Sequence, residues 1–496
     1  MGTPLRFSSL ISLAPKCGSI VQLLRRRFSG SHLSRSLLSH CDISIPLELE
    51  PLRALAQTFN STPKLAAECR SIRFTPPADE NVLHYDEQYD EEENFHRLHA
   101  ADRALSDQMA SIFASCADHG ALRSIRWNGA AAYERTLRKP VWDAIARHSG
   151  SLQELEVAAA TAAQGDQVEG EAEEWLSITR PSYPNLRVLL LSFRNAHGWP
   201  CEELQNMLTN NCPALEELSL ETPWCCGPSG LGLSFTLPRL KSFELRGEKL
   251  QFVEESKDFL IRHPHLERLT LHTEQPLRPA NSDALRALSI AQGVVSNLDE
   301  KYDQKLDSFD LKRFGKNIVH LRLMEMPHMS QIMTRGAIHS VAQTVRCLEL
   351  DGEDFRSFEP LLEHLGGALA ETTQLAELSI ANNNYWPEDP PWTIDHLRQL
   401  LAVLSRIPDL PLRALRIFSH SKIGVPLPQD FLDDVGPIPE QLEYIGWEVF
   451  KPGLNDVQST LYHVEGRTAR LVEADYISSA SRRMDWTGES ILNHLA

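Results

Sequence analysis

The chain has 496 residues, of which 42% are hydrophobic, and its formal net charge is −18. This length exceeds what one ordinary globular core accommodates, whereas an array of repeats escapes the limit because each repeat packs only on its neighbours. The negative charge argues against nucleic-acid binding, which needs clustered Lys and Arg, and no apolar run approaches the ~20 residues of a membrane-spanning helix.

The first segment, residues 1–43, is basic and rich in serine. It has no Asp or Glu before residue 42, and five arginines punctuate it. This composition is typical of a mitochondrial presequence. The alternative is the basic start of an ordinary helical domain.

Residues 44–121 predict a linker helix, a first divergent repeat strand and an acidic loop. Pro51 suits the first turn of a helix that ends before Pro63, and a strand is expected over 69–74. The helix would carry four apolar residues on one face: Leu52, Leu55, Ala56 and Phe59.

An acidic run occupies residues 86–93, where six of eight residues are Asp or Glu. Charge runs of this kind usually lie in solvated loops. We therefore predict a loop, with the docking of a basic partner as the alternative.

A Leu-x-x-Leu-x-Leu frame recurs through residues 122–450 and organises the chain. Its clearest copy begins at Leu215, after Pro213, and close copies begin at Leu186 and Leu266. Looser copies begin at Leu122, Leu152, Leu240, Leu285, Ile318, Val345, Leu375, Leu412 and Leu442. The twelve starts run from 122 to 442, a mean interval of about 29 residues, near the upper end of leucine-rich periods.

Short amphipathic segments precede several frames and predict helices between the strands. Residues 140–145 begin with proline and carry Trp142 on an apolar face, and 203–208 and 259–261 are similar. A helix before each strand supplies the crossover that parallel strands need. The Asn of a strict asparagine ladder occurs only as Asn383. We therefore predict an α/β repeat fold: an irregular leucine-rich-repeat-like solenoid, with a curved parallel sheet inside, helices outside and a small α-helical N-terminal segment.

Three stretches interrupt the frame and are predicted to be insertions: 165–174, 221–235 and 382–391. After the last frame, residues 451–496 are expected to cap the array. Strands at 459–464 and 467–474, around a Glu-Gly turn, predict a hairpin that covers the last sheet edge, and 484–495 predict a short helix.

The side chains at positions three and five of the frames form the predicted partner-binding site. The apolar residues at positions one, four and six point into the core, so the intervening ones face the concave surface, by the two-residue period of a strand. The strip expected to contact a protein partner comprises Glu154, Glu156, Glu217, Ser219, Glu244, Arg268 and Thr270. The alternative is a solvated sheet face without a ligand.

Catalytic signatures are missing, since the sequence has no G-x-x-x-x-G-K-[ST], no G-x-G-x-x-G and no H-E-x-x-H. Adjacent cysteines rarely bind one zinc ion in tetrahedral geometry. We therefore interpret the following as core or loop residues: Cys212, Cys225, Cys226, His263 and His265. No catalytic residue, no cofactor and no metal is predicted, and the protein is expected not to be an enzyme.

Nine cysteines occur without any C-x-x-C pair, and their number is odd. Mostly buried thiols in a reducing compartment explain this pattern. We expect a cytoplasmic or nuclear protein, with a mitochondrial location as the alternative if the basic N-terminal segment is a presequence.

With the repeats in place, the chain resembles fungal F-box proteins that carry leucine-rich-repeat-like C-terminal regions. The Leu-Arg-Arg-Arg-Phe segment 24–28, followed by 37–43, is similar to the end of an F-box and the stretch after it. Residues 52–73 resemble the linker helix and first strand of that family. The segments 442–447 and 462–464 resemble its closing repeat.

This resemblance implies a substrate-recognition subunit of a ubiquitin ligase, which binds a protein substrate on its concave face. It also implies that Leu24 and Phe28, within residues 1–43, contact a Skp-type adaptor. The Leu-Pro-x-Glu that opens an F-box does not occur before Leu24. The alternatives are a free-standing interaction scaffold without a ligase connection and a mitochondrial repeat protein.

Overall fold

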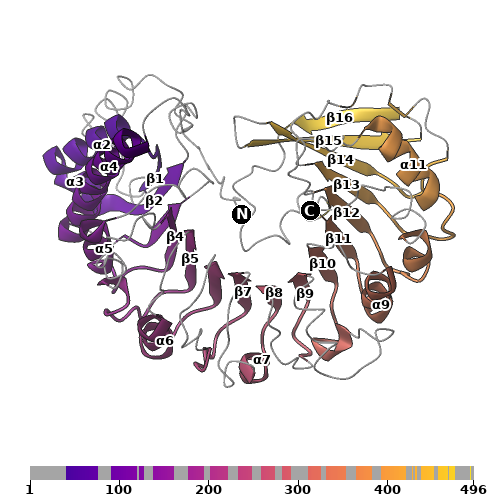
Figure 1. Ribbon diagram of the computed structural model, residues 1–496, viewed down its shortest axis with the longest axis horizontal. Coiled ribbons are helices and arrows are strands. Elements are labelled where there is room, and N and C mark those ends of the chain that lie inside the picture. The colour runs from indigo at the N-terminus through magenta and orange to yellow at the C-terminus, as the bar shows by residue number, and fades with distance from the viewer. Residues whose placement is uncertain are drawn as a thin grey trace, which may run out of the picture. The chain divides into compact units, whose positions relative to one another are not determined.

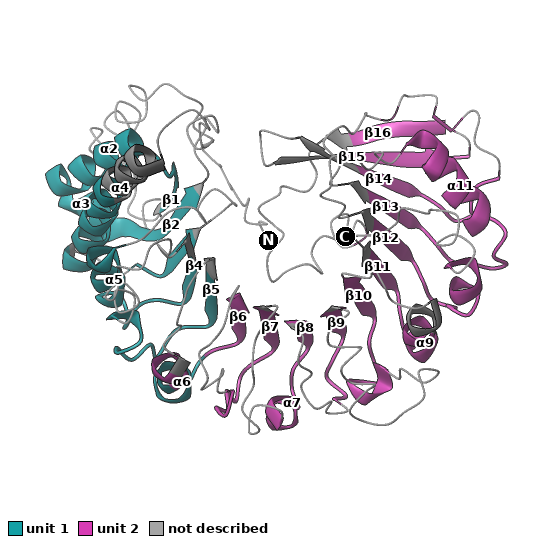
Figure 2. Ribbon diagram, viewed as in Figure 1, with its two compact units in different colours: residues 1–196, 206–214 teal, residues 197–205, 215–496 magenta. Residues whose placement is uncertain are grey.

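The computed structural model describes residues 41–75, 91–119, 122–127, 138–160, 177–194, 201–221, 233–247, 258–273, 282–291, 311–324, 331–352, 365–382, 393–419, 427, 431–432, 437–451, 456–466, 468–474 and 492. The chain forms two compact units, residues 1–196 with 206–214 and residues 197–205 with 215–496 (Figure 2). The boundary falls inside the segment 122–450, which the sequence presents as one array. In each unit the helices that Figure 1 labels lie along one face of a sheet, and we use the name helix-free face for the opposite face, on which none of these labelled helices lies.

The first unit is a parallel sheet whose strands follow one another in chain order. Its elements are β1 (Cys41–Pro46), α2 (Leu49–Ser61), α3 (Pro63–Glu68), β2 (Cys69–Thr75), α4 (Glu91–His119), β3 (Ser124–Trp127), α5 (Lys139–Ala146), β4 (Glu154–Ala160) and β5 (Val188–Arg194). The helix α6 (Cys201–Asn210) has residues in both units.

The second unit continues the same pattern and ends differently. Its elements are β6 (Glu217–Glu221), β7 (Ser242–Gly247), α7 (Phe259–Arg262), β8 (Arg268–Thr273), β9 (Ala287–Ala291), η6 (Leu311–Arg313), β10 (His320–Met324), α9 (Gln331–Val341), β11 (Cys347–Gly352), β12 (Glu377–Asn382), α11 (Ile394–Leu404), β13 (Ala414–Ser419), β14 (Tyr444–Lys451), β15 (Asp456–Glu465) and β16 (Thr468–Ala474). The strands β6 to β14 are parallel, whereas β15 and β16 are antiparallel to their neighbours. The predicted α/β class, with a mainly parallel sheet, is therefore confirmed.

The apolar positions of the frame form the core, as predicted. Leu215, Leu218 and Leu220 are each 0% exposed. Position four of one frame lies beside position four of the next, because Leu218 pairs with Phe243 and Phe243 pairs with Leu269. Burial of one such side chain contributes about 1.5–3 kcal/mol. The recurring leucines therefore stabilise the packing of each strand beside its neighbours in the sheet.

In most frames, the carbonyl at position two accepts two hydrogen bonds from the start of the next strand. The oxygen of Glu216 accepts from the backbone N–H of Lys241 at 2.8 Å and of Ser242 at 3.1 Å. The same arrangement occurs at position two of other frames, at the carbonyls of Arg123, Gln153, Lys241, Glu267, Arg286, Val319, Arg346, Ala376 and Arg413. The backbone geometry therefore repeats from strand to strand even where the side chains differ.

Hydroxyl groups connect neighbouring repeats in place of an asparagine ladder. Ser151 Oγ donates to the carbonyl of Leu122 at 2.7 Å, and Thr344 Oγ1 donates to the carbonyl of Ile318 at 2.7 Å. Each hydroxyl residue directly precedes the first apolar residue of its own frame. Its hydroxyl group bonds to the carbonyl of the first apolar residue of the previous frame. A hydrogen bond of this kind contributes about 1 kcal/mol, so each of these two side chains helps to hold its frame against the previous one.

The predicted helices are present within a few residues of their expected bounds. The linker helix is α2, which begins two residues before Pro51 and ends before Pro63. It buries the four expected apolar residues, Leu52, Leu55, Ala56 and Phe59. The helix expected from Pro140 is α5, with Trp142 buried, and the segments 203–208 and 259–261 lie in α6 and α7.

Two elements of the first unit differ from the sequence-based prediction. A strand, β1, pairs with β2, so the strand expected first at 69–74 is the second one. The loop predicted for 86–93 is wrong for its last three residues, because α4 begins at Glu91; residues 86–90 lie outside the described part. Residues 91–93 are helical because they belong to α4, whose later apolar residues recur at helical spacing and are buried. These residues are Leu105, Met109, Ile112, Phe113 and Cys116.

The predicted C-terminal hairpin is present and consists of β15 and β16. Gly466, in the turn, has φ of 62°, which glycine adopts without a Cβ penalty. The strand β15 pairs with β14 and so covers the edge of the parallel strands. The helix expected over 484–495 and the three predicted insertions fall almost entirely outside the described residues.

Gly315 occupies a position where a side chain has no room. A Cβ there would lie 2.7 Å from the carbonyl oxygen of Ser282 and 3.0 Å from Cβ of Leu285. Replacing Gly315 with Ala is expected to lower the free energy of unfolding by about 1–3 kcal/mol, because packed backbone must move apart. In the control Gly367→Ala the added Cβ meets nothing within 4 Å, and a small stabilisation of about 0.5–1 kcal/mol is expected for this helical residue. Urea midpoints compare the two variants, and equal midpoints would contradict the prediction.

Candidate functional site on the helix-free face

The predicted strip begins in the first unit at β4. Glu154 Oε2 accepts hydrogen bonds from Ser124 Oγ at 2.7 Å and from Arg126 Nη2 at 2.5 Å. The side chains of Arg126 and Glu154 keep 38% and 31% of their surface exposed, and Glu156 beside them is half-buried. This part of the face offers a paired charge that solvent, and hence a partner, reaches.

In the second unit the accessible part of the strip is one ion pair. Arg268 Nη2 on β8 lies 2.7 Å from Glu217 Oε1 on β6, and the pair spans the buried Ser242 of the intervening β7. The two side chains are 25% and 31% exposed. Glu217 and Arg268 thus present both charge signs at one point of the face.

The remaining members of the predicted strip are buried. Glu244 Oε2 accepts from Ser219 Oγ at 2.8 Å, its Oε1 lies 2.5 Å from Arg246, and its side chain is 4% exposed. Thr270 and Ser219 are also buried. Ser219 and Glu244 connect the neighbouring strands β6 and β7. The strip therefore divides into accessible charged residues and buried polar residues.

A second group of side chains lies further along the same face, and the sequence analysis did not single it out. We call it the buried polar cluster: the buried residues His320, Cys347, Glu349, Glu377 and Arg416, together with Arg322, whose side chain is 17% exposed. They occupy positions three and five of the frames that begin at Ile318, Val345, Leu375 and Leu412. The rule that gives the predicted strip therefore finds them as soon as it is extended past residue 270.

Glu349 is the centre of the buried polar cluster. Its Oε1 lies 2.5 Å from His320 Nε2, and its Oε2 lies 3.5 Å from Arg322 Nε. Burial alone would raise the pKa of Glu349, but His320, Arg322 and Arg416 favour the carboxylate and hold the pKa below its ordinary value. The carboxylate is thus kept charged in a place that solvent does not reach.

Cys347 lies beside this carboxylate as a neutral thiol. Burial, followed by the negative charges of Glu377 and Glu349, raises its pKa well above the ordinary value. A thiol of this kind is a poor nucleophile, because the thiolate is the reactive form. We therefore expect a ligand-binding or structural role, and not nucleophilic attack, for the group of Cys347, His320 and Glu349.

One residue from near the C-terminus contacts this end of the face. The backbone N–H of Leu492 donates to Glu377 Oε2 at 3.2 Å. The side chain of Leu492 packs against Ala414 and Leu461, as that of Tyr444 also does. The helix-free face thus accepts a peptide N–H and a leucine side chain from a segment that lies 115 residues away from Glu377.

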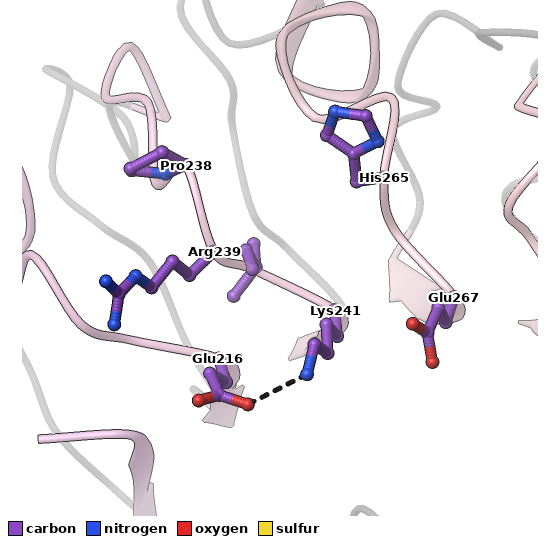
Figure 3. A pocket seen from close by; sticks show the side chains of 7 residues that line it. Glu216, Pro238, Arg239, Lys241, His265 and Glu267 are labelled. Carbon is purple, nitrogen blue, oxygen red and sulfur yellow. Dashed lines mark hydrogen bonds and ion pairs between the residues drawn. The ribbon is translucent and has the colours of Figure 1, made fainter.

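A shallow pocket lies just before three strands of the second unit, at frame positions one and two and at residues that directly precede the frames. Its lining residues are Glu216, Pro238, Arg239, Leu240, Lys241, His265 and Glu267 (Figure 3). Lys241 Nζ lies 3.0 Å from Glu216 Oε2, and the lysine side chain is 53% exposed. Exposed ion pairs contribute little free energy, so the helix-free face is the better candidate site.

Two residues considered for a zinc site are separate core residues. Cys212 is buried in the first unit, and burial raises the pKa of its thiol to about 12. His263 is buried in the second unit, where its Nδ1 contacts the carbonyl of Phe259 and its Nε2 accepts from the N–H of Leu237. Their interpretation as core residues is confirmed, whereas Cys225 and Cys226 lie outside the described residues.

The predicted adaptor contact falls where the structure gives no description, because Leu24 and Phe28 belong to residues 1–40. Within the described part of the chain, no helix combines the length and the apolar character needed to cross a membrane. Neither a protein-family model nor any curated protein matches this sequence.

Proposed function

We propose that this chain is a protein-binding repeat protein without catalytic activity, which holds a protein partner on its helix-free face. The repeat type that we propose is an irregular leucine-rich-repeat-like solenoid. Two features support it: the frame with a mean interval of about 29 residues, and the carbonyl at position two with its pair of hydrogen bonds.

The contact of Leu492 is the observation that carries this proposal. A backbone N–H bound by Glu377, together with a leucine side chain packed against Ala414 and Leu461, is the kind of contact by which a surface holds a peptide segment. The accessible pair Glu217 and Arg268 on the same face adds charges that would orient a partner. Binding is therefore expected to need both the apolar end of the face and its charged part.

Charge reversal on the helix-free face tests the proposal. In capture from cell extract followed by mass spectrometry, Glu217→Lys is expected to reduce recovery of the main bound protein at least tenfold, because it repels Arg268 and the matching group of the partner. The control is Glu443→Lys, which reverses the same charge in the exposed pair Arg413–Glu443 at frame position two, away from the face. It is expected to leave recovery unchanged.

A swapped pair separates binding from folding. The double variant Glu217→Arg with Arg268→Glu keeps an ion pair at this place but inverts the charges that a partner meets. We expect it to unfold at the same urea concentration as the unaltered chain and still to lose the partner. Full recovery by the double variant would contradict the use of this pair in binding.

The more specific role that we propose is that of an F-box-like substrate-recognition subunit of a ubiquitin ligase. Its support is the resemblance of segments 24–28 and 37–43 to the end of an F-box. The solenoid would hold a target while the N-terminal segment connects it to the ligase, which raises the local concentration of the target at the transfer machinery. Such a protein acts in the cytoplasm or nucleus.

The test of this role is binding to a purified Skp-type adaptor. Binding by the full chain that disappears when residues 1–41 are removed would support it. Absence of binding by either chain would favour the second candidate, a free-standing scaffold without a ligase connection. A mature protein in cells that begins near residue 30 to 40 would instead favour a mitochondrial repeat protein.

A further inference from the structure

Three potential metal ligands of different chemistry meet in the buried polar cluster. A ring nitrogen of His320, the sulfur of Cys347 and a carboxylate oxygen of Glu349 all lie within 4.8 Å of one another. His320 and Cys347 are directly paired residues of β10 and β11, and Glu349 follows Cys347 by two residues on the same face. All three side chains are buried. The parallel register itself therefore brings them together.

We propose that His320, Cys347 and Glu349 bind one zinc ion. Zinc accepts imidazole nitrogen, thiolate sulfur and carboxylate oxygen together, with bonds of roughly 2.0–2.3 Å, so ligand atoms in a tetrahedral site lie roughly 3.3–3.8 Å apart. The three atoms are already within reach of that spacing. Harder ions such as Mg²⁺ and Ca²⁺ prefer oxygen ligands and are poorly matched to a set with sulfur and nitrogen.

Of the two carboxylate oxygens of Glu349, only Oε1 is placed to bind the ion. Arg322 lies on the Oε2 side of Glu349, and Oε1 is the atom directed at His320. Glu377, which pairs in register with Cys347 on β12, adds a further negative charge next to the thiol. This charge favours a divalent cation and balances the nearby arginines, in the manner of the outer groups that tune metal sites.

Zinc binding releases the thiol proton of Cys347. This proton passes to solvent, and the thiolate, a ring nitrogen of His320 and Oε1 of Glu349 become the ligands. Arg322 remains on the Oε2 side of Glu349.

Cobalt(II) is the probe for this site, because it takes the place of zinc and, with a thiolate ligand, absorbs light. The full chain, freed of metal by a chelator and dialysed, is titrated with Co²⁺. We expect one equivalent to bind, with a sulfur-to-cobalt charge-transfer band and the visible bands of a tetrahedral ion. An equivalent of Zn²⁺ should then abolish these bands.

Two variants and one control decide the result. Cys347→Ser should remove the charge-transfer band, and Glu349→Gln should weaken Zn²⁺ binding at least about tenfold, a loss within the range seen when groups at metal sites are altered. Cys212→Ser removes another buried cysteine and should leave the band unchanged. Circular dichroism checks that each variant is folded. The proposal is overturned if the unaltered chain takes up no stoichiometric Co²⁺, or if the band survives in Cys347→Ser.

Discussion

Replacing Phe259 with Ala is expected to lower the free energy of unfolding of the second unit by about 3–5 kcal/mol, the usual cost of removing a buried phenylalanine. The ring is 0% exposed and belongs to α7, a helix of only four residues. Its centroid lies 4.4 Å from that of Phe243, 5.6 Å from that of Phe235 and 4.1 Å from that of the His263 ring. So short a helix has little stability of its own, and loss of the ring removes what holds it against the sheet.

The same helix provides the control for this prediction. Ile261 lies two residues after Phe259, and 54% of its surface is exposed. Ile261→Ala is therefore expected to change the free energy of unfolding by no more than about 0.5 kcal/mol. Urea titrations followed by circular dichroism measure both variants. If the two cost the same, packing of Phe259 is not what holds α7 in place.

The second large effect is expected at Glu349, in the chain freed of metal. Glu349→Ala removes the carboxylate that lies among Arg322 and Arg416, which are buried or nearly so, and that contacts His320. Removing one partner of a buried charge pair typically costs about 3–5 kcal/mol, because the remaining charge is neither solvated nor paired. We expect a loss of this size in urea titrations.

Glu443→Ala is the matched control for Glu349→Ala. It also removes a glutamate that pairs with arginine across adjacent strands, but the side chains of Arg413 and Glu443 are 48% and 42% exposed. Solvent screens such a pair, so a cost of at most about 1 kcal/mol is expected. A loss at Glu349 no greater than that at Glu443 would mean that water reaches the buried polar cluster.

The apolar frame explains why so much of the fold could be predicted from the sequence. The apolar residue at position four is buried in every frame for the same physical reason, so residues such as Leu218 and Leu269 identify their strands without knowledge of anything else in the chain. The hairpin is equally local, because its turn glycine and alternating strands lie within twenty residues of one another. Such features need only short-range patterns.

Elements without a local pattern are the ones that the sequence does not reveal. The strand β1 has only six residues and no frame, and its place is fixed by pairing with β2. The N-terminal turn of α4 consists of Glu residues that suggest a loop by themselves, whereas buried residues further along, such as Phe113, carry the helix through them.

The candidate site is only partly legible for a similar reason. The period of two indicates which side chains face away from the leucines, and it places Glu217 and Arg268 on one face. It does not say which of them are buried, as Glu244 is, because that depends on the neighbours from other strands. The proposed ligands His320 and Cys347 are 27 residues apart in the sequence. They therefore do not form a short metal-binding motif that could be recognised in the sequence.

Within each unit every strand pairs with strands that adjoin it in the sequence, and this has a consequence for synthesis on the ribosome. Contacts between chain neighbours close small loops, which favours rapid folding. Each repeat can therefore dock as it emerges, and the nascent protein grows by one strand at a time. Until β15 has been translated, the newest strand leaves unpaired backbone groups at its edge. The hairpin at the end of the second unit covers the last parallel strand, β14. A chain whose synthesis stops before residue 456 would expose the unpaired backbone groups of this strand, to which other chains could bind.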